Sequence, residues 1–297
     1  MSHLSLCSPN QLKEVPGLSD TEDTGYMTPD AWAEHVSEQE IVVAMRFSYW
    51  GKSGWKSPAS QDKTLLFDTD RLLLRLSLLQ SLALPSLAAQ TDQRFHLHVL
   101  TSWGLPVWAK QALREACEEV LSEGQFTIDP RRWSLAASQY RNYLRDRYGT
   151  ARILQVVLDD DDGLSTDFLA NMRQEMAMMA APETTQAVRF ISQSRGYGLD
   201  LTNLDTSAIT LYPMRSAFIN LGLALSAQAD GMNIYGIAHR ATPPQHPHVV
   251  CKARRMFVRT IHSRNDSRVA VNTGWKPVPN WREKPDIVAR FPWLFRL

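Results

Sequence analysis

The chain has 297 residues, 44% hydrophobic and 21% charged, which is enough to bury a substantial core in one large domain or two small ones. Its 32 Lys and Arg residues almost balance its 31 Asp and Glu residues, so a net charge of +1 gives no electrostatic reason to expect a nucleic-acid partner. Its three cysteines form no C-x-x-C pair, which argues against a disulfide framework or a structural zinc site and fits a reducing cytoplasm.

Residues 1–38 are rich in Pro, Gly and acidic side chains, and we expect a loosely ordered arm with one short helix near residues 29–34. The arm has no basic segment followed by an apolar one, so no signal peptide is predicted. The most apolar stretch, residues 72–89, is interrupted by Arg75, Gln80 and Pro85, which indicates a core helix rather than a membrane span. We therefore expect a cytoplasmic protein without a transmembrane segment, and peripheral membrane contact stays open.

Residues 39–297 are expected to form one domain whose first part alternates strands and helices. Short apolar runs near 40–47, 95–100 and 153–158 are typical of strands buried on both faces. Helical spacing predicts helices over 70–89, 106–122, 133–148 and 165–181, with Asp70 as the N-cap of the first. Further strands are predicted near 187–192, 207–213 and 234–238, and a helix near 252–260. This order indicates an α/β fold with a mostly parallel central sheet flanked by helices.

Four consecutive aspartates, Asp159 to Asp162, follow the predicted strand 153–158 without a spacer. In open α/β sheets ligands bind at the carboxyl ends of the strands, and adjacent carboxylates need a cation or protons to offset their repulsion. Mg²⁺ or Mn²⁺ bound through one or two carboxylates and substrate phosphates would meet that need. A solvated acidic loop is the simpler interpretation. A metal-dependent phosphohydrolase or nucleotidyltransferase, and a non-catalytic interaction protein, are the other open alternatives.

Several segments resemble the bacterial rhamnosyltransferase family, whose members are glycosyltransferases of the GT-A type with a D-x-D motif. The resemblance covers most of residues 40–270 and rests on the order of four segments. These are Arg46-Phe47-Ser48 after the first strand, the leucine-rich helix 71–87, the block 158–164 with its four aspartates, and the late segment 257–265. Asp160 departs from the family pattern, in which the second motif position is usually not acidic.

The resemblance implies a GT-A-like, Rossmann-related sandwich that transfers a sugar, with rhamnose as the expected donor sugar. The donor would be a nucleotide-diphosphate sugar, and the acceptor a carbohydrate or glycoconjugate hydroxyl. Asp159, with Asp160 beside it, is expected to face the nucleotide, while Asp161 and Asp162 are expected to bind Mn²⁺ or Mg²⁺.

The same resemblance assigns roles to four residues outside the aspartate block. Arg46, Phe47 and Ser48 would contact the nucleotide base and ribose, with Phe47 stacking on the base. His262 would contact the metal or the diphosphate. Each of these side chains has an ordinary structural interpretation too, in the core for Phe47 and as a lone histidine for His262.

An inverting transfer also needs a carboxylate that takes the proton of the acceptor hydroxyl. Asp200 and Asp205 lie in a polar segment beyond the aspartate block and are the candidates for this catalytic base. The segment fits an ordinary surface hairpin as well.

Overall fold

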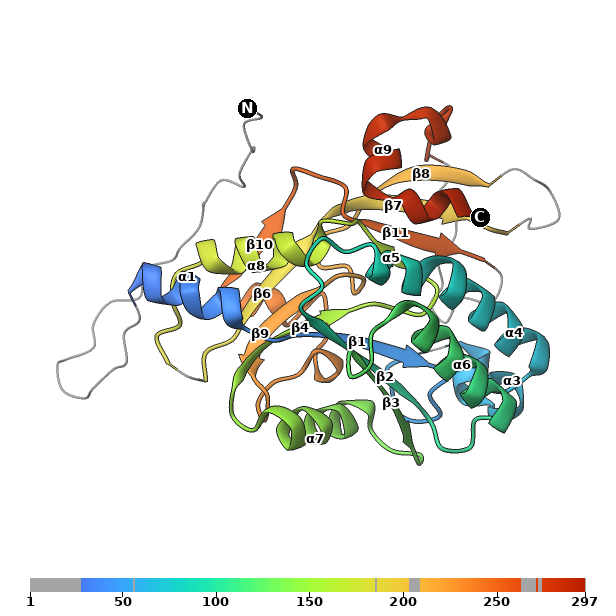
Figure 1. Ribbon diagram of the computed structural model, residues 1–297, viewed down its shortest axis with the longest axis horizontal. Helices are drawn as coiled ribbons and strands as arrows, with labels where there is room; N and C mark the ends of the chain where they lie inside the picture. The colour runs from blue at the N-terminus through green and yellow to red at the C-terminus, as the bar shows by residue number, and fades with distance from the viewer. Residues whose placement is uncertain are drawn as a thin grey trace.

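Two β-sheets and the helices around them make up the folded chain (Figure 1). The computed structural model describes residues 28–55, 57–184, 186–202, 209–262, 271 and 274–296. The larger sheet has seven strands in the order β10-β6-β9-β4-β1-β2-β3. They are β1 (Ile41–Phe47), β2 (Phe95–Ser102), β3 (Phe126–Arg131), β4 (Arg152–Val157), β6 (Arg189–Gln193), β9 (Ala224–Gln228) and β10 (His248–Cys251).

The centre of this sheet is parallel. β4, β1, β2 and β3 run in one direction, whereas β9 runs antiparallel to both β4 and β6. All seven residues of β1 are buried, as expected for a parallel strand covered on both faces. The carboxyl ends of these four strands therefore meet at one edge of the sheet.

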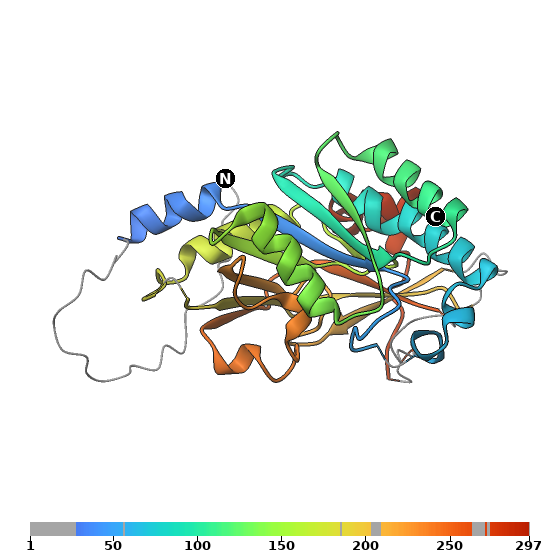
Figure 2. The ribbon, with the colours of Figure 1, turned by 90° about the horizontal axis from the view of Figure 1, so that it is seen from below.

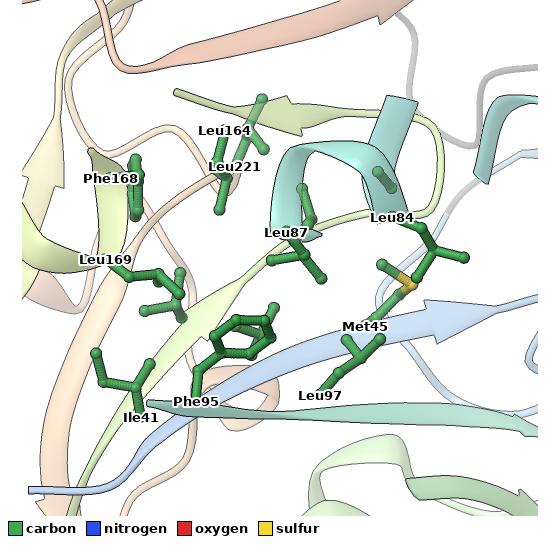
Figure 3. Close-up of a cluster of buried hydrophobic side chains, with 14 of the residues drawn as sticks. Ile41, Met45, Leu84, Leu87, Phe95, Leu97, Leu164, Phe168, Leu169 and Leu221 are labelled. Atoms are coloured by element: carbon green, nitrogen blue, oxygen red, sulfur yellow. The ribbon is translucent and has the colours of Figure 1, made fainter. Parts of the chain in front are cut away.

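Helices pack around the two sheets, and both faces of the large sheet are covered. The helices of the described residues are α1 (Pro29–Glu38), α2 (Pro58–Gln61), α3 (Lys63–Leu66), α4 (Thr69–Leu78), α5 (Leu84–Ala88), α6 (Val107–Val120), α7 (Ala136–Tyr148), α8 (Phe168–Met178) and α9 (Pro285–Arg290), the last of which packs on the smaller sheet. On one face, Met45 of β1 packs in a core with leucines of α4, α5 and α6 and with Phe168 of α8 (Figure 3). On the other face, Val42 and Ala44 pack against Tyr140 and Leu144 of α7.

The smaller sheet begins with the two residues that directly follow the aspartate block. Its strands are β5 (Gly163–Leu164), β7 (Arg195–Asp200), β8 (Thr210–Arg215) and β11 (Phe257–Ile261), in the order β5-β11-β7-β8. Gly163 pairs with Val258 of β11, and a Cβ at position 163 would lie 2.3 Å from the ring of Trp293. The Trp293 indole nitrogen donates to the Leu164 carbonyl at 3.1 Å. The glycine thus lets the C-terminal segment pack directly on the turn.

The structure confirms the predicted α/β class and the elements of the first 180 residues. The predicted helix 70–89 is divided by a π-helical turn at Leu79–Ala83, directly before Pro85, which has no backbone N–H to continue the regular pattern. Its N-cap is Asp68 rather than Asp70, because the Asp68 carboxylate accepts a hydrogen bond from the Arg71 amide at 2.9 Å.

Two predictions in the last third are wrong. The segment predicted as a strand at 234–238 forms a 3₁₀ turn, Ile234–Gly236, and the segment predicted as a helix at 252–260 contains strand β11 instead. Phe257, Val258 and Ile261 are β-prone residues that are at most 2% exposed. Val258 packs with the C-terminal segment and Phe257 lies in the main core, and this packing overrides the helical spacing.

The described end of the predicted N-terminal arm is a docked helix. Trp32 and Val36 of α1 are each 1% exposed, and the Trp32 indole donates to the Met176 carbonyl of α8 at 3.1 Å. Figures 1 and 2 both show α1 lying beside α8. Of the helices in the described ranges, none is both long and apolar enough to cross a bilayer.

Candidate active site

The four aspartates form a tight turn at the carboxyl end of β4, between the two sheets. The Asp162 amide donates to the Asp159 carbonyl at 3.2 Å. Asp160 is fully buried and Asp161 and Asp162 are each 4% exposed, whereas the Asp159 side chain is 26% exposed. The four carboxylates therefore differ in their access to a ligand, and Asp159 is the most open.

Arg75 of α4 holds the inner part of the turn. Its guanidinium is 2% exposed and binds both carboxylate oxygens of Asp160, with the Nε–Oδ2 distance at 3.0 Å. Its Nη1 donates to Asp161 Oδ2 at 2.7 Å. Such a two-pronged, charge-assisted contact fixes the orientation of the carboxylate as well as neutralising it. Asp160 is thus turned into the protein toward Arg75, and we do not retain it among the nucleotide-binding residues.

The end of β11 supplies a second set of contacts. The Thr260 amide donates to Asp162 Oδ1 at 2.9 Å, and His262 Nε2 lies 3.0 Å from Asp161 Oδ2. Because a carboxylate only accepts hydrogen bonds, this contact requires the proton of His262 to be on Nε2. In this arrangement Nε2 holds the Asp161 carboxylate in place, and the role of His262 toward a metal stays a prediction.

The carboxyl end of β1 contributes Arg46. Its Nη2 lies 3.9 Å from Asp159 Oδ1, and its guanidinium lies over the rings of Trp55 and Tyr235 at 4.5 and 4.7 Å. It also donates to the Ser53 carbonyl. Arg46 therefore connects the aspartate turn to the loop that follows β1.

Phe47 and Ser48 point away from the aspartate turn. Phe47 is fully buried in the core, so its ring has no face available for a nucleotide base. The Ser48 hydroxyl accepts a hydrogen bond from Arg71 Nη1 at 3.0 Å and is 1% exposed. Ser48 has a φ of 44°, a strained value for a residue with a side chain, and its carbonyl is held by the Ser102 hydroxyl at 2.7 Å. Both residues shape the loop after β1 rather than facing a ligand.

Burial and neighbouring charges separate the pKa values of these aspartates. Burial raises the pKa of Asp159, and Arg46 offsets part of that rise. Burial and then the nearby Asp161 carboxylate raise the pKa of Asp162 well above its ordinary value. Burial acts on Asp161 in the same direction, but Arg75 and the hydrogen bond from His262 together bring its pKa below the ordinary value. Arg259 of β11 lowers all three.

The donor set fits a divalent cation that shares its ligands with a substrate. Four carboxyl groups lie near the guanidinium groups of Arg46, Arg75 and Arg259, so the fourth negative charge needs either a proton, as the raised pKa of Asp162 indicates, or an added cation. The Asp159 Oδ1 atom is buried and has no hydrogen-bond partner among the described residues. No group of three or more His, Cys, Asp or Glu residues in the described ranges surrounds a common metal position. A cation that takes most of its ligands from phosphates and water remains compatible with this set.

Of the two predicted catalytic bases, Asp205 lies outside the described residues. Asp200 ends β7, opposite Ile261 of β11, and so lies one residue away from the position of His262 in the pairing register. Its Oδ1 accepts hydrogen bonds from the Thr202 amide at 3.0 Å and the Thr202 hydroxyl at 2.6 Å. Asp200 thus lies at the same end of the smaller sheet as His262, and its carboxylate is hydrogen-bonded to Thr202 in a local turn.

The sequence interpretation missed Arg75 as a site residue. The sequence did contain an indication that Arg75 is buried and paired. Arg71 and Arg75 interrupt an otherwise leucine-rich helix at a spacing of four residues, which puts them on the same helix face. Arginines inside an apolar stripe are buried only when they are paired. The sequence did not show that their partners would be Ser48 and the aspartate turn.

Comparison with known proteins gives one family and several distant structures. The profile of the family described as "Putative rhamnosyl transferase" matches residues 40–273. No curated protein matches the chain. The structure of S. aureus TarS 1-349 aligns at 11% identity and a TM-score of 0.40, over 74% of this chain and 60% of that one.

Two further structures are similarly distant. A longer S. aureus TarS structure aligns at 10% identity and a TM-score of 0.39, over 75% of this chain and 36% of that one. HddC from Yersinia pseudotuberculosis aligns at 8% identity and a TM-score of 0.32, over 75% of this chain and 90% of that one. The chain thus spans less than two thirds of the length of either TarS structure.

Proposed function

Because the chain belongs to the family described as putative rhamnosyl transferases, and is a glycosyltransferase by that membership, we propose that it takes its sugar from a nucleotide-diphosphate donor. The sugar passes to a hydroxyl of a carbohydrate or glycoconjugate, and rhamnose is the donor sugar that the family description favours. The observation that carries the proposal is the excess of carboxylates over guanidinium groups at the carboxyl edge of the parallel strands.

Asp159 and Asp161 are the residues proposed to hold Mg²⁺ or Mn²⁺ together with the donor phosphates. Asp159 is the most open carboxylate of the turn, and Asp161 is held in place by Arg75 and His262. When bound, the cation would supply positive charge that stabilises the departing nucleoside diphosphate. Asp162, predicted as a ligand, is bound to the Thr260 amide and serves to fix the turn.

The arginines at this edge have separate tasks. Arg75 is fully engaged with Asp160 and Asp161 and pre-organises the turn. Arg46 contacts Asp159 only at 3.9 Å and reaches the loop after β1, so it is the guanidinium proposed to contact a donor phosphate. Asp200 is retained as the proposed catalytic base, because β7 and β11 bring it to the same edge as His262.

The reaction class is tested by measuring what is released from nucleotide sugars. The purified chain is incubated with Mn²⁺, a panel of dTDP-, UDP- and GDP-linked sugars and a mixture of glycan acceptors. We expect release of the nucleoside diphosphate from one donor, and its loss in Asp161→Ala. Asp146→Asn is the matched control, because the Asp146 side chain is 67% exposed on α7 and forms a surface pair with its neighbour Arg145. Release of inorganic phosphate or pyrophosphate instead would show a phosphohydrolase or nucleotidyltransferase and reject the proposal.

A further inference from the structure

A cluster of exposed tryptophans and basic residues lies at the carboxyl ends of β2 and β3. Ten large apolar side chains are exposed among the described residues, and half of them come from the two short segments after these strands. They are Trp103 (58% exposed), Val107 (79%), Trp108 (40%), Trp133 (57%) and Leu135 (49%). Exposed apolar side chains concentrated in this way mark an interaction surface more often than scattered ones do.

Backbone and ring contacts join the two segments into one surface, which we call the Trp–Lys patch. The Trp103 amide donates to the Arg131 carbonyl at 2.7 Å, and the Arg132 guanidinium lies 5.8 Å from the Trp103 ring. Lys52, from the loop after β1, forms a bridge with Leu135, and its ammonium lies 5.8 Å from the Trp133 ring. Three loops that follow adjacent parallel strands thus build the patch.

The charge of the Trp–Lys patch is positive. Lys52, Lys110 and Arg132 lie against its tryptophans, and Lys110 also donates to the Trp103 carbonyl. Residues 103–108 and 131–135 contain no acidic side chain, and Asp129 of the preceding strand β3 is paired with Arg131 at 2.6 Å and with His98 at 3.1 Å. Its negative charge is therefore offset inside the protein.

We propose that the Trp–Lys patch binds the surface of an anionic lipid bilayer. Indole rings favour the headgroup level of a membrane, where an apolar body and a polar N–H are both accommodated. Lysine and arginine beside them are attracted to anionic lipids, and one apolar anchor such as Val107 adds buried area. A second copy of the chain is the less suitable occupant, because a symmetric contact would bring the same cations together.

The patch and the candidate active site share the loop after β1. Arg46, which contacts Asp159, lies over the Trp55 ring and donates to Ser53, and Lys52 of the same loop reaches Leu135. A bilayer bound to the patch would therefore lie close to the candidate active site. Membrane binding itself does not depend on the proposed transferase activity and is tested without it.

The test is cosedimentation of the full chain with vesicles of phosphatidylcholine alone or mixed with phosphatidylglycerol. We expect binding only to the mixed vesicles, weakening as salt is raised. Lys52→Gln and Arg132→Gln should each lower the vesicle partition coefficient about fivefold, the equivalent of about 1 kcal/mol per charge. Trp103→Ala combined with Trp133→Ala should lower it further.

Two matched controls and one mass measurement make the result decisive. Leu73→Ala on α4 and Arg145→Gln on α7 change side chains that are equally exposed but lie outside the patch, and both should bind as the wild type does. The charge variants keep the proposal testable if the tryptophan variant does not fold. Equal binding to both vesicle types, or patch variants that bind like the wild type, would overturn it. So would a patch-dependent dimer in light scattering without vesicle binding.

Discussion

The two ends of the central parallel strands, called here the amino edge and the carboxyl edge of the sheet, both hold aspartates paired with buried arginines. The two edges differ in the ratio of acidic to basic groups. At the amino edge, Arg173 binds Asp92 through Nε at 2.7 Å and donates to the carbonyls of Val36, Gln39 and Arg94. Arg94 and Arg173 there match the charges of Asp92 and Glu40. At the carboxyl edge, four carboxylates face three guanidinium groups, and one carboxylate, Asp159, is partly open.

The difference shows why a buried ion pair is not by itself a sign of function. A buried ion pair with balanced charges and satisfied hydrogen bonds needs no additional ligand. Pairs of this kind join α1, β1, β2 and α8 at the amino edge. An excess of like charge is costly unless a proton or a cation neutralises it, and this imbalance is the basis of the proposal that the carboxyl edge binds an additional cation.

The largest expected effect comes from Arg75→Met. Asp160 would remain buried without its partner and Asp161 would lose its hydrogen bond from Arg75, so we expect the free energy of unfolding to fall by about 3–5 kcal/mol. Adding Asp160→Asn should restore part of this loss, because it removes the stranded charge. Urea denaturation of the two single variants and the double variant measures the coupling. Strictly additive effects would contradict the proposed role of Arg75.

Arg173→Met should destabilise the protein by less than Arg75→Met does, since Asp92 loses Arg173 at the amino edge but keeps its pair with Arg94. Arg94→Met is the matched comparison, because the Arg94 side chain is 67% exposed and its pair with Asp92 should contribute less than about 1 kcal/mol. Urea denaturation gives both values. The comparison of the two edges fails if Arg173→Met also abolishes nucleotide binding in a protein that is still folded.

Removal of the divalent cation should affect only the carboxyl edge. With EDTA in place of Mn²⁺, we expect nucleoside diphosphate affinity to fall at least tenfold, or about 1.4 kcal/mol. The melting temperature of the protein without nucleotide should change little, because at most two carboxylates of the turn would bind the cation directly. Isothermal titration calorimetry and thermal melting measure the two quantities. Unchanged affinity in EDTA would show that the arginines alone bind the phosphates.

The smallest effect is a pH dependence at the amino edge. Burial acts to raise the pKa of Asp92, but its hydrogen bonds and ion pairs with Arg94 and Arg173 lower it to about 2. A folded-state pKa below the unfolded value gives stability that is present above about pH 4 and is lost as the pH falls toward 2. Asp92→Asn should therefore lower the melting temperature at pH 6 and converge with the wild type at the acid end. Parallel melting curves across this range would contradict the assignment.

The sequence predicted β1, β2 and β4 because these strands are continuous apolar runs separated by well-formed helices. Strand β3 was missed, since Thr127, Asp129 and Pro130 give it the polar character of a sheet edge. Strand β11 was taken for a helix because its apolar residues gain their burial from parts of the chain that are distant in the sequence. Val258 packs against β7 and the C-terminal segment, and Phe257 lies in the main core.

The aspartate turn could be located from sequence, but the roles within it could not. Position alone indicated that Asp159 to Asp162 follow a parallel strand. Asp160 is bound by Arg75 whereas Asp159 stays open, and this difference in role depends on a helix residue 85 positions earlier in the chain. Phe47 was likewise indistinguishable from a ligand-facing aromatic until its place in the core was known.

The most direct test of this account is titration of a nucleoside diphosphate, with Mn²⁺ present, into the wild type, Asp159→Asn and Asp92→Asn. We expect Asp159→Asn to lose at least tenfold in affinity while its melting temperature is unchanged or raised, because burial makes that charge unfavourable in the free protein. Asp92→Asn should keep its affinity and melt at a lower temperature. If Asp159→Asn binds the nucleotide as tightly as the wild type does, the carboxyl edge is not the donor site.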